Sequence, residues 1–192
     1  ARHTGGYLPF YINLTNDLAY GKENEILIRL DNRENPHIPP GKPLNELDFL
    51  WYSGLYRNVS LYVTDKLHIT THAQSSEPPG GGIITGLGDV SSESATLTLS
   101  AQVVNDDRMP RSFRMRNILL DAAGLEVASS LSELTDLEPG QSTCLMTRIM
   151  VMQPALWTPE TPFLYTIRTE LLSENGSVKD SRETRTGIRT VR

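Results

Sequence analysis

Residues 48–57 combine the side chains that a loop needs to hold a polar, ring-shaped ligand. The carboxylate of Asp48 is followed by Trp51, Tyr52 and Tyr56, and the guanidinium of Arg57 closes the segment. Carboxylates accept hydrogen bonds from sugar hydroxyls, and flat aromatic faces cover the apolar C–H side of a pyranose ring. The same aromatic residues could instead be core side chains at the start of the next strand, and their types alone leave both interpretations open.

Other residues that could bind a metal or form a disulfide are few or badly spaced. On one strand, His68 and His72 would lie about 13 Å apart, whereas ligands of one zinc ion lie about 2 Å from it. We therefore expect surface histidines and no metal site. The single cysteine, Cys144, excludes an intrachain disulfide, and its apolar neighbours predict a buried thiol.

Composition narrows the class of protein and of partner. The chain has 192 residues, of which 38% are hydrophobic and 21% charged, and a net charge of −5. These values are typical of a soluble globular protein, and the acidic balance argues against a nucleic-acid partner. No apolar run approaches the roughly 20 residues of a membrane span, and the first residues lack a signal-peptide core. The compartment, cytoplasm or periplasm, stays open.

Alternation with a period of two dominates the chain and predicts β-strands. In the clearest example, Leu97, Leu99, Ala101 and Val103 share one face. Trp157, within a proline-rich run, is expected to pack as an anchor near the start of a later strand. About seven strands in this length predict an immunoglobulin-like sandwich. The strand-like segments are 67–72, 95–105, 112–120, 125–131, 142–152, 163–173 and 177–191.

Four stretches of the chain, in order, resemble glycoside hydrolase family 2, the group that includes β-galactosidases. Residues 48–61 resemble the end of the family's N-terminal jelly-roll domain. Residues 5–15 and 24–32 resemble two earlier strands of that domain. Residues 156–165, together with 187–189, resemble the close of the family's second domain, which is an immunoglobulin-like sandwich.

The resemblance implies an all-β chain with two parts. Residues 1–66 would form a partial jelly-roll segment, the C-terminal part of a galactose-binding-like domain, and residues 67–192 an immunoglobulin-like β-sandwich. The first part shows only three convincing strands, near 9–15, 24–31 and 58–64, whereas a jelly roll has about eight. We therefore expect a fragment that lacks its leading strands, with open edges that could pair in a homo-oligomer.

The resemblance also implies that this fragment has no catalytic residues. Both catalytic glutamates of the family lie in a (β/α)₈ barrel that follows the sandwich, and no alternation of strands and amphipathic helices occurs here. A retaining glycosidase holds its two carboxyl groups about 5–5.5 Å apart. We expect the chain to scaffold that barrel, to reach carbohydrate only through the full enzyme, and to be inactive alone.

Asp48 and Trp51 are the substrate-binding candidates. In similar β-galactosidases the aspartate matching Asp48 contacts the galactosyl group directly or through a bound sodium ion. Sodium or magnesium is thus expected in the full enzyme, and no cofactor in the fragment. The structural alternative is that Asp48 caps its loop by accepting backbone N–H bonds, and Arg57 is expected to make a structural pair.

Three other functions compete with the scaffold hypothesis. A stand-alone carbohydrate-binding module would use Trp51, Tyr52 and Tyr56 as a stacking platform. A purely structural sandwich would bury Trp51 and bind no ligand. Within the enzyme class, the parent could instead be a β-glucuronidase or a β-mannosidase.

Overall fold

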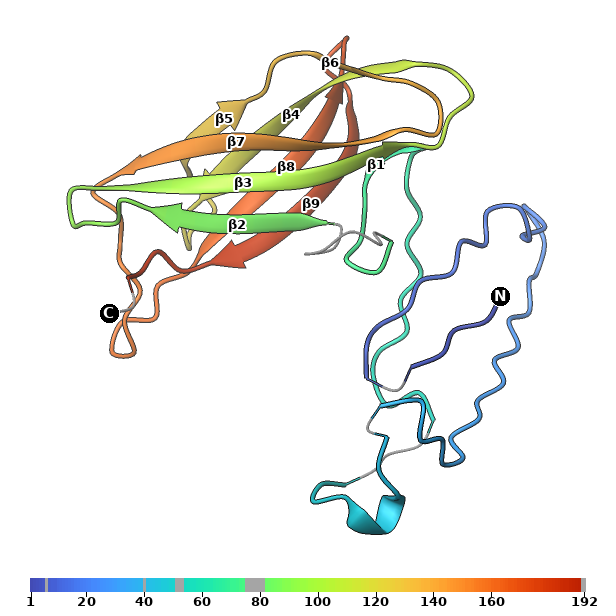
Figure 1. Ribbon diagram of the computed structural model, residues 1–192. Helices are drawn as coiled ribbons and strands as arrows, with labels where there is room; N and C mark the ends of the chain where they lie inside the picture. Colours follow the sequence, from blue (N-terminus) through green and yellow to red (C-terminus); the bar gives the residue numbers. More distant parts are fainter. Residues whose placement is uncertain (6, 40, 51–53, 75–81, 191–192) are drawn as a thin grey trace. The chain divides into compact units, whose positions relative to one another are not determined.

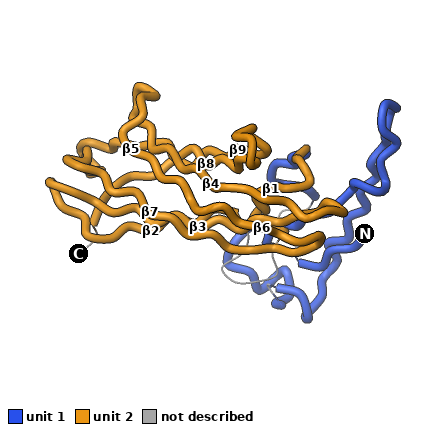
Figure 2. The backbone as a smooth tube through the Cα atoms, turned by 90° about the horizontal axis from the view of Figure 1, so that it is seen from above, with its two compact units in different colours: residues 1–62 blue, residues 63–192 orange. Residues whose placement is uncertain are grey.

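The chain divides into two compact units, which are described separately. The computed structural model describes residues 1–5, 7–39, 41–50, 54–74 and 82–190. Unit 1 comprises residues 1–62 and unit 2 residues 63–192 (Figure 2). The boundary expected from the sequence lies slightly further along, after residue 66.

Unit 2 is a sandwich of two antiparallel sheets, as Figure 1 shows. In sheet A, the long strand β3 (Ser94–Asn105) pairs with each of the three other strands. These are β1 (Leu67–Ile69), β2 (Ile83–Gly88) and β7 (Ser142–Met152). In sheet B, β4 pairs with β5, β6 and β8, and β8 pairs with β9: β4 (Arg111–Leu120), β5 (Glu126–Leu131), β6 (Thr135–Leu137), β8 (Tyr165–Ser173) and β9 (Val178–Thr186). The all-β sandwich predicted from the sequence is confirmed.

Nine strands occur among the described residues of unit 2, two more than the sequence indicated. The first addition, β2, contains Gly86 and Gly88, and glycine weakens a strand signal because it has no side chain to pack. The second, β6, has only three residues and pairs with the start of β4. Both strands form because a longer neighbour supplies their hydrogen bonds.

Alternation along the strands places the core between the sheets. In β3, Leu97, Leu99, Ala101 and Val103 are each at most 1% exposed, as their spacing predicted. Their partners across the sandwich fall into two buried clusters, one around Leu119 and Ile167 and one around Phe113, Met115 and Leu171. Because a strand alternates strictly, one face supplies the core and the other meets solvent or another surface.

A chain of buried polar groups joins the two sheets. The amide of Asn117 on β4 donates to Thr147 Oγ1 on β7 at 2.8 Å, and its carbonyl oxygen accepts a hydrogen bond from Thr169 Oγ1 on β8 at 2.5 Å. Asn117 and Thr169 are fully buried. Buried polar groups are tolerated when they are hydrogen-bonded, so this chain fixes how sheet A lies on sheet B.

A second polar cluster lies where β3 turns toward β4. Asn105 is fully buried and donates to the carbonyl oxygens of Met109 and Leu137. Asp107 accepts a hydrogen bond from the Arg108 backbone and pairs with the Arg111 guanidinium. The Arg108 amide and then the Arg111 side chain lower the pKa of Asp107 to about 2.

Two expectations about unit 2 are wrong. Cys144 is exposed, because its apolar neighbours alternate along β7 and Leu145 points inward while Cys144 points outward. His68 is buried instead of lying on the surface, with its ring nitrogens near the Asp65 carbonyl oxygen and the Gln74 amide. Since β1 already ends at Ile69, His72 follows it in a turn and is exposed.

Unit 1 contains no β-strand among its described residues, and its one regular element is a single 3₁₀ turn, η1 (Leu44–Glu46). The strands expected near 9–15, 24–31 and 58–64 are therefore wrong as hydrogen-bonded elements. A strand needs a neighbour to satisfy its backbone groups, and these segments do not pair with one another. The apolar side chains of the middle segment, Ile26, Leu27, Ile28 and Leu30, are 45–91% exposed.

Candidate functional site: the loop around Asp48

Asp48 lies in unit 1 just after η1, and its side chain is exposed. Among the residues that the structure describes, the Asp48 carboxylate makes no hydrogen bond and no ion pair. The expected alternative role, a cap on the backbone of its own loop, thus finds no donor within the described part of the chain. A carboxylate that is exposed and unoccupied in this way can accept hydrogen bonds from an external ligand.

The described aromatic rings near Asp48 come from two distant parts of the sequence. The ring of Tyr7 meets that of Phe49 edge to face, with 6.4 Å between centroids and 66° between planes. Partial removal from water and, second, the neighbouring phenol of Tyr56 raise the pKa of Tyr7. Tyr7, Phe49 and Tyr56 are each just under half exposed, so they offer an accessible aromatic surface in unit 1, and Phe49 directly follows Asp48 in the chain.

Sequence reasoning missed the pair of Tyr7 and Phe49. Both residues stood inside the segments that carry the family resemblance, but they are 42 positions apart and nothing in their local spacing joins them. Because edge-to-face aromatic pairs stabilise by about 0.5–1.5 kcal/mol beyond burial, this contact can hold the first segment against the loop.

Arg57 contacts an aromatic ring rather than a carboxylate. Its guanidinium carbon lies 6.0 Å from the centroid of the Tyr56 ring, at the outer limit of a cation–π interaction. The structural pair expected for Arg57 with a carboxylate or carbonyl does not occur among the described residues. Trp51 and Tyr52 lie outside the described residues, so the predicted role of Trp51 stays a prediction.

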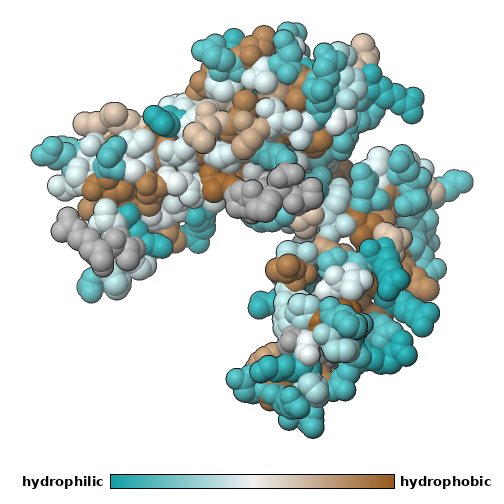
Figure 3. Space-filling model, in the orientation of Figure 1, coloured by the Kyte–Doolittle hydropathy of each residue, from teal (hydrophilic) through white to brown (hydrophobic). Residues whose placement is uncertain are grey.

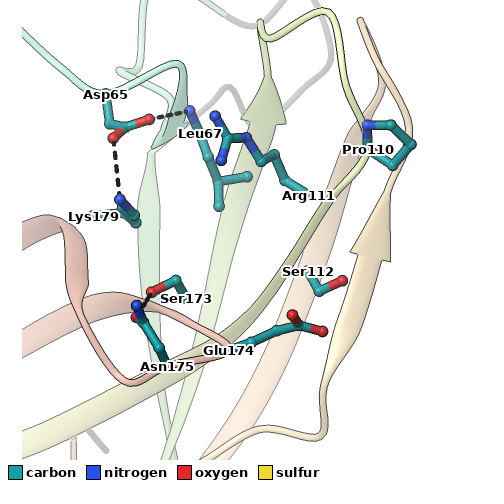
Figure 4. A pocket seen from close by; sticks show the side chains of 9 residues that line it. All are labelled: Asp65, Leu67, Pro110, Arg111, Ser112, Ser173, Glu174, Asn175 and Lys179. Atoms are coloured by element: carbon teal, nitrogen blue, oxygen red, sulfur yellow. Dashed lines mark hydrogen bonds and ion pairs between the residues drawn. The ribbon is translucent and has the colours of Figure 1, made fainter.

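A polar hollow of about 290 Å³ lies at one end of unit 2 (Figure 4). Asp65 accepts a hydrogen bond from the Leu67 amide at 3.2 Å and lies 3.9 Å from Lys179 Nζ. Ser173 and Asn175 are hydrogen-bonded at 2.7 Å. The hollow has no aromatic lining residue. Without a stacking surface, and with most of its polar groups paired among themselves, it suits a sugar poorly.

Trp157 connects two other segments that carry the resemblance. Its backbone N–H donates to the carbonyl oxygen of Ile188 at 2.8 Å, and Arg189 lies 4.9 Å above its ring. A Cβ at Gly187 would come within 2.9 Å of the Trp157 ring. Trp157 is thus the packing anchor that its setting suggested, and residues 187–189 are its contact.

The described residues show neither a metal-binding cluster nor a membrane-spanning helix. These residues include no group of three or more His, Cys, Asp and Glu side chains that could hold a metal ion. Asp48 alone could supply one oxygen ligand, whereas sodium- and magnesium-like hard cations take several. None of the described helices is long and apolar enough to cross a membrane.

Comparison with known proteins gives consistent matches. The profile of glycosyl hydrolases family 2 matches residues 84–189. A β-galactosidase of Thermoanaerobacter pseudethanolicus is 30% identical over 98% of this chain and 23% of its own length. A β-galactosidase of Bacteroides ovatus is 32% identical over 96% of this chain and 19% of its own. A β-glucuronidase of Formosa agariphila is 28% identical over 96% of this chain and 19% of its own.

Solved structures match in the same way. The crystal structure of a Bacteroides uniformis β-glucuronidase aligns with a TM-score of 0.71 and 26% identity. The alignment covers 83% of this chain and 18% of that one. It extends beyond unit 2, which is about two thirds of the chain. The chain thus spans about a fifth of the length of the relatives named here.

Proposed function

This chain belongs to the glycosyl hydrolases family 2, and we propose that it is a non-catalytic part of a β-galactosidase-like glycosidase. The observation that carries the proposal is that 96–98% of the chain matches only about a fifth of curated β-galactosidases. The described residues form antiparallel sheets and one 3₁₀ turn. A (β/α)₈ barrel needs parallel strands alternating with helices, so in this proposal the catalytic barrel would come from another part of the parent polypeptide.

In this proposal the sandwich supports the barrel and the loop around Asp48 contributes to the sugar pocket. The support for Asp48 is its exposed carboxylate, which has no hydrogen bond or ion pair within the described chain, and the presence of the partly exposed rings of Tyr7, Phe49 and Tyr56 in the same unit. The carboxylate would accept hydroxyl hydrogen bonds from the galactosyl group or supply one ligand of a sodium or magnesium ion. Trp51 would add a stacking surface. The barrel would hydrolyse the glycosidic bond with retention of configuration.

A β-glucuronidase parent is the second candidate. It is favoured by the Formosa agariphila relative and by the Bacteroides uniformis structure, both of which are named β-glucuronidases. Glucuronides carry a carboxylate at C6 where galactosides carry a hydroxymethyl group, and the two sugars also differ in configuration at C4. Comparing kcat/KM of the parent enzyme for aryl galactosides and aryl glucuronides therefore separates the two candidates.

Asp48→Asn in the parent enzyme tests the role of the loop. Asparagine keeps the size of the side chain but removes its charge, so kcat/KM for an aryl galactoside should fall by at least tenfold. The matched control is Asp17→Asn, since Asp17 is also an exposed aspartate of unit 1. Equal activity of the two variants would exclude Asp48 from the sugar pocket.

A further inference from the structure

The two outer faces of the sandwich differ in charge. On sheet B, ion pairs cross between neighbouring strands: Arg116 with Glu170 at 2.5 Å and Arg168 with Glu183 at 3.1 Å. On sheet A, Arg148 is the one charged outward residue of β2, β3 and β7. An ion-paired face is well solvated, whereas a face of uncharged side chains with exposed apolar groups is typical of an interaction surface.

The outer face of sheet A carries long side chains along β7 and glycines, which have no side chain, along β2. On β7 the outward residues include Met146, Met150 and Met152, each about two-thirds exposed. On β2 the outward positions include Gly86 and Gly88, which have no side chain. The strand pairing aligns these positions in three rows across β3: Ile84–Ser100–Met146, Gly86–Thr98–Arg148 and Gly88–Thr96–Met150.

A shallow depression of about 470 Å³ crosses this face over β3. The threonines of β3 form its floor, and residues of β2, of the turn after it and of β7 form its sides: Gly88, Asp89, Thr96, Thr98, Arg148 and Met150. In the view of Figure 1 sheet A lies in front, and Figure 3, in the same orientation, shows pale and brown residues among the teal over it. Methionine is flexible and polarisable, and it fills irregular gaps.

We propose that this face binds the same face of a second copy of the chain, through a two-fold axis that runs along β3. A rotation about that axis places β7 of one copy over β2 of the other and keeps each row in register. Met150 then fills the space above Gly88 of the second copy. A two-fold contact is self-complementary because each copy offers both the projection and the hollow.

Charge supports a second copy as the occupant. Asp89 follows directly after Gly88 and is exposed. Neither Asp89 nor Arg148 has an ion pair within the described part of the chain. The same rotation brings Arg148 of each copy to the β2 side of the other, within reach of its Asp89. The contact therefore forms two equivalent ion pairs and leaves the one outward cation of the face neutralised.

The area of the face indicates how tightly the proposed dimer should associate. Ser94 to Gln102 on β3 spans about 27 Å, and three strands span about 14 Å, which gives about 380 Å² per copy. Stable complexes bury about 800 Å² on each partner. We therefore expect a weak dimer, and sedimentation over a range of protein concentrations should reveal it.

Cys144 provides a reporter on this face. It is the only cysteine of the chain, it is exposed, and its Sγ lies 2.9 Å from Ser100 Oγ. Strands pack about 4.8 Å apart in a sheet and facing sheets about 10 Å apart, so the two Cys144 Cα atoms of the dimer should lie about 14 Å apart. A spin label at Cys144 should show strong dipolar broadening that disappears on dilution.

Gly88→Arg in the 192-residue chain tests the contact. A Cβ at Gly88 would meet no heavy atom within 4 Å, so the variant should fold normally while it fills the hollow with a cation. The dimer dissociation constant should rise by at least tenfold. Ser181→Arg is the matched control, because Ser181 is exposed on the outer face of sheet B and faces Glu170.

Each result decides the proposal. Self-association that brings the Cys144 labels close together, is lost in Gly88→Arg and persists in Ser181→Arg supports it. A chain that stays monomeric throughout overturns it and leaves the face to another polypeptide. A dimer that is unchanged in Gly88→Arg, or whose labels are far apart, also overturns it and places the contact elsewhere, for example on the exposed apolar residues of unit 1.

Discussion

Units 1 and 2 share the same alternating sequence pattern but differ in what becomes of it. In unit 2 the alternation of β3 buries Leu97 and Leu99 between two sheets. In unit 1 the similar alternation of Ile26, Ile28 and Leu30 gives exposed chain with no ladder. The difference shows that a period of two marks the ability to form a strand, while a partner strand and a second sheet make the strand form.

We expect the largest difference in stability between the two units when a core side chain of unit 2 is truncated. Phe113 is fully buried between the sheets, so Phe113→Ala should lower the free energy of unfolding by about 3–5 kcal/mol. Ile28→Ala in unit 1 removes an exposed side chain and should change the free energy of unfolding by less than about 0.5 kcal/mol. Urea unfolding of both variants measures the contrast. Equal destabilisation would show that the two units share one core.

A smaller effect is expected from the polar chain between the sheets. Asn117→Ala removes the donor to Thr147 and the acceptor of Thr169. Leaving buried polar groups without partners should cost about 1–3 kcal/mol of stability. Thr98→Ala, on the outer face of β3, is the control and should be nearly neutral. Thermal unfolding that is unchanged in Asn117→Ala would show that the sheets do not depend on this link.

The smallest effect is a pH dependence of the sandwich that should come from Asp107 and not from Asp31. Asp107 in unit 2 and Asp31 in unit 1 both have a pKa lowered to about 2, Asp107 by the Arg108 amide and Arg111, Asp31 by Arg33. A lowered carboxyl pKa stabilises the folded state above the unfolded pKa of about 3.9, and that stability is lost as the pH falls toward 2.

Unfolding of the sandwich followed between pH 5 and pH 2, roughly the range over which such a carboxylate protonates, checks this prediction. Asp107→Asn should flatten the loss of stability with falling pH, because the charged form no longer contributes. Asp31→Asn should leave the sandwich profile unchanged, since Arg33 and Asp31 pair locally within unit 1. A profile altered equally by both variants would break the proposed independence of the units.

Much of unit 2 was predictable because the local sequence pattern of its long strands indicates them. The alternation in β3 and β7 and the turns between strands indicated a sandwich. Features that depend on neighbours were missed: β2, whose glycines weaken its signal, the three-residue strand β6, and the outward placement of Cys144, which follows from the phase of β7. His68 is buried by contacts from Asp65 and Gln74, which no local pattern shows.

The candidate site was predictable in part. The exposure of Asp48 agrees with a ligand role, and its residue type and position suggested that role from sequence alone. The pairing of Tyr7 with Phe49 was not predictable, because it joins segments far apart in the chain. Long-range contacts of this kind follow from the fold as a whole.

The most direct test of the central claim is the turnover of a chromogenic β-galactoside by the purified 192-residue chain, beside the parent enzyme under the same conditions. We predict hydrolysis by the parent enzyme and none by the chain alone, since under the proposed function the chain would supply support and a pocket loop but no catalytic barrel. Hydrolysis by the chain itself, at a rate that persists through repeated purification, would contradict the account.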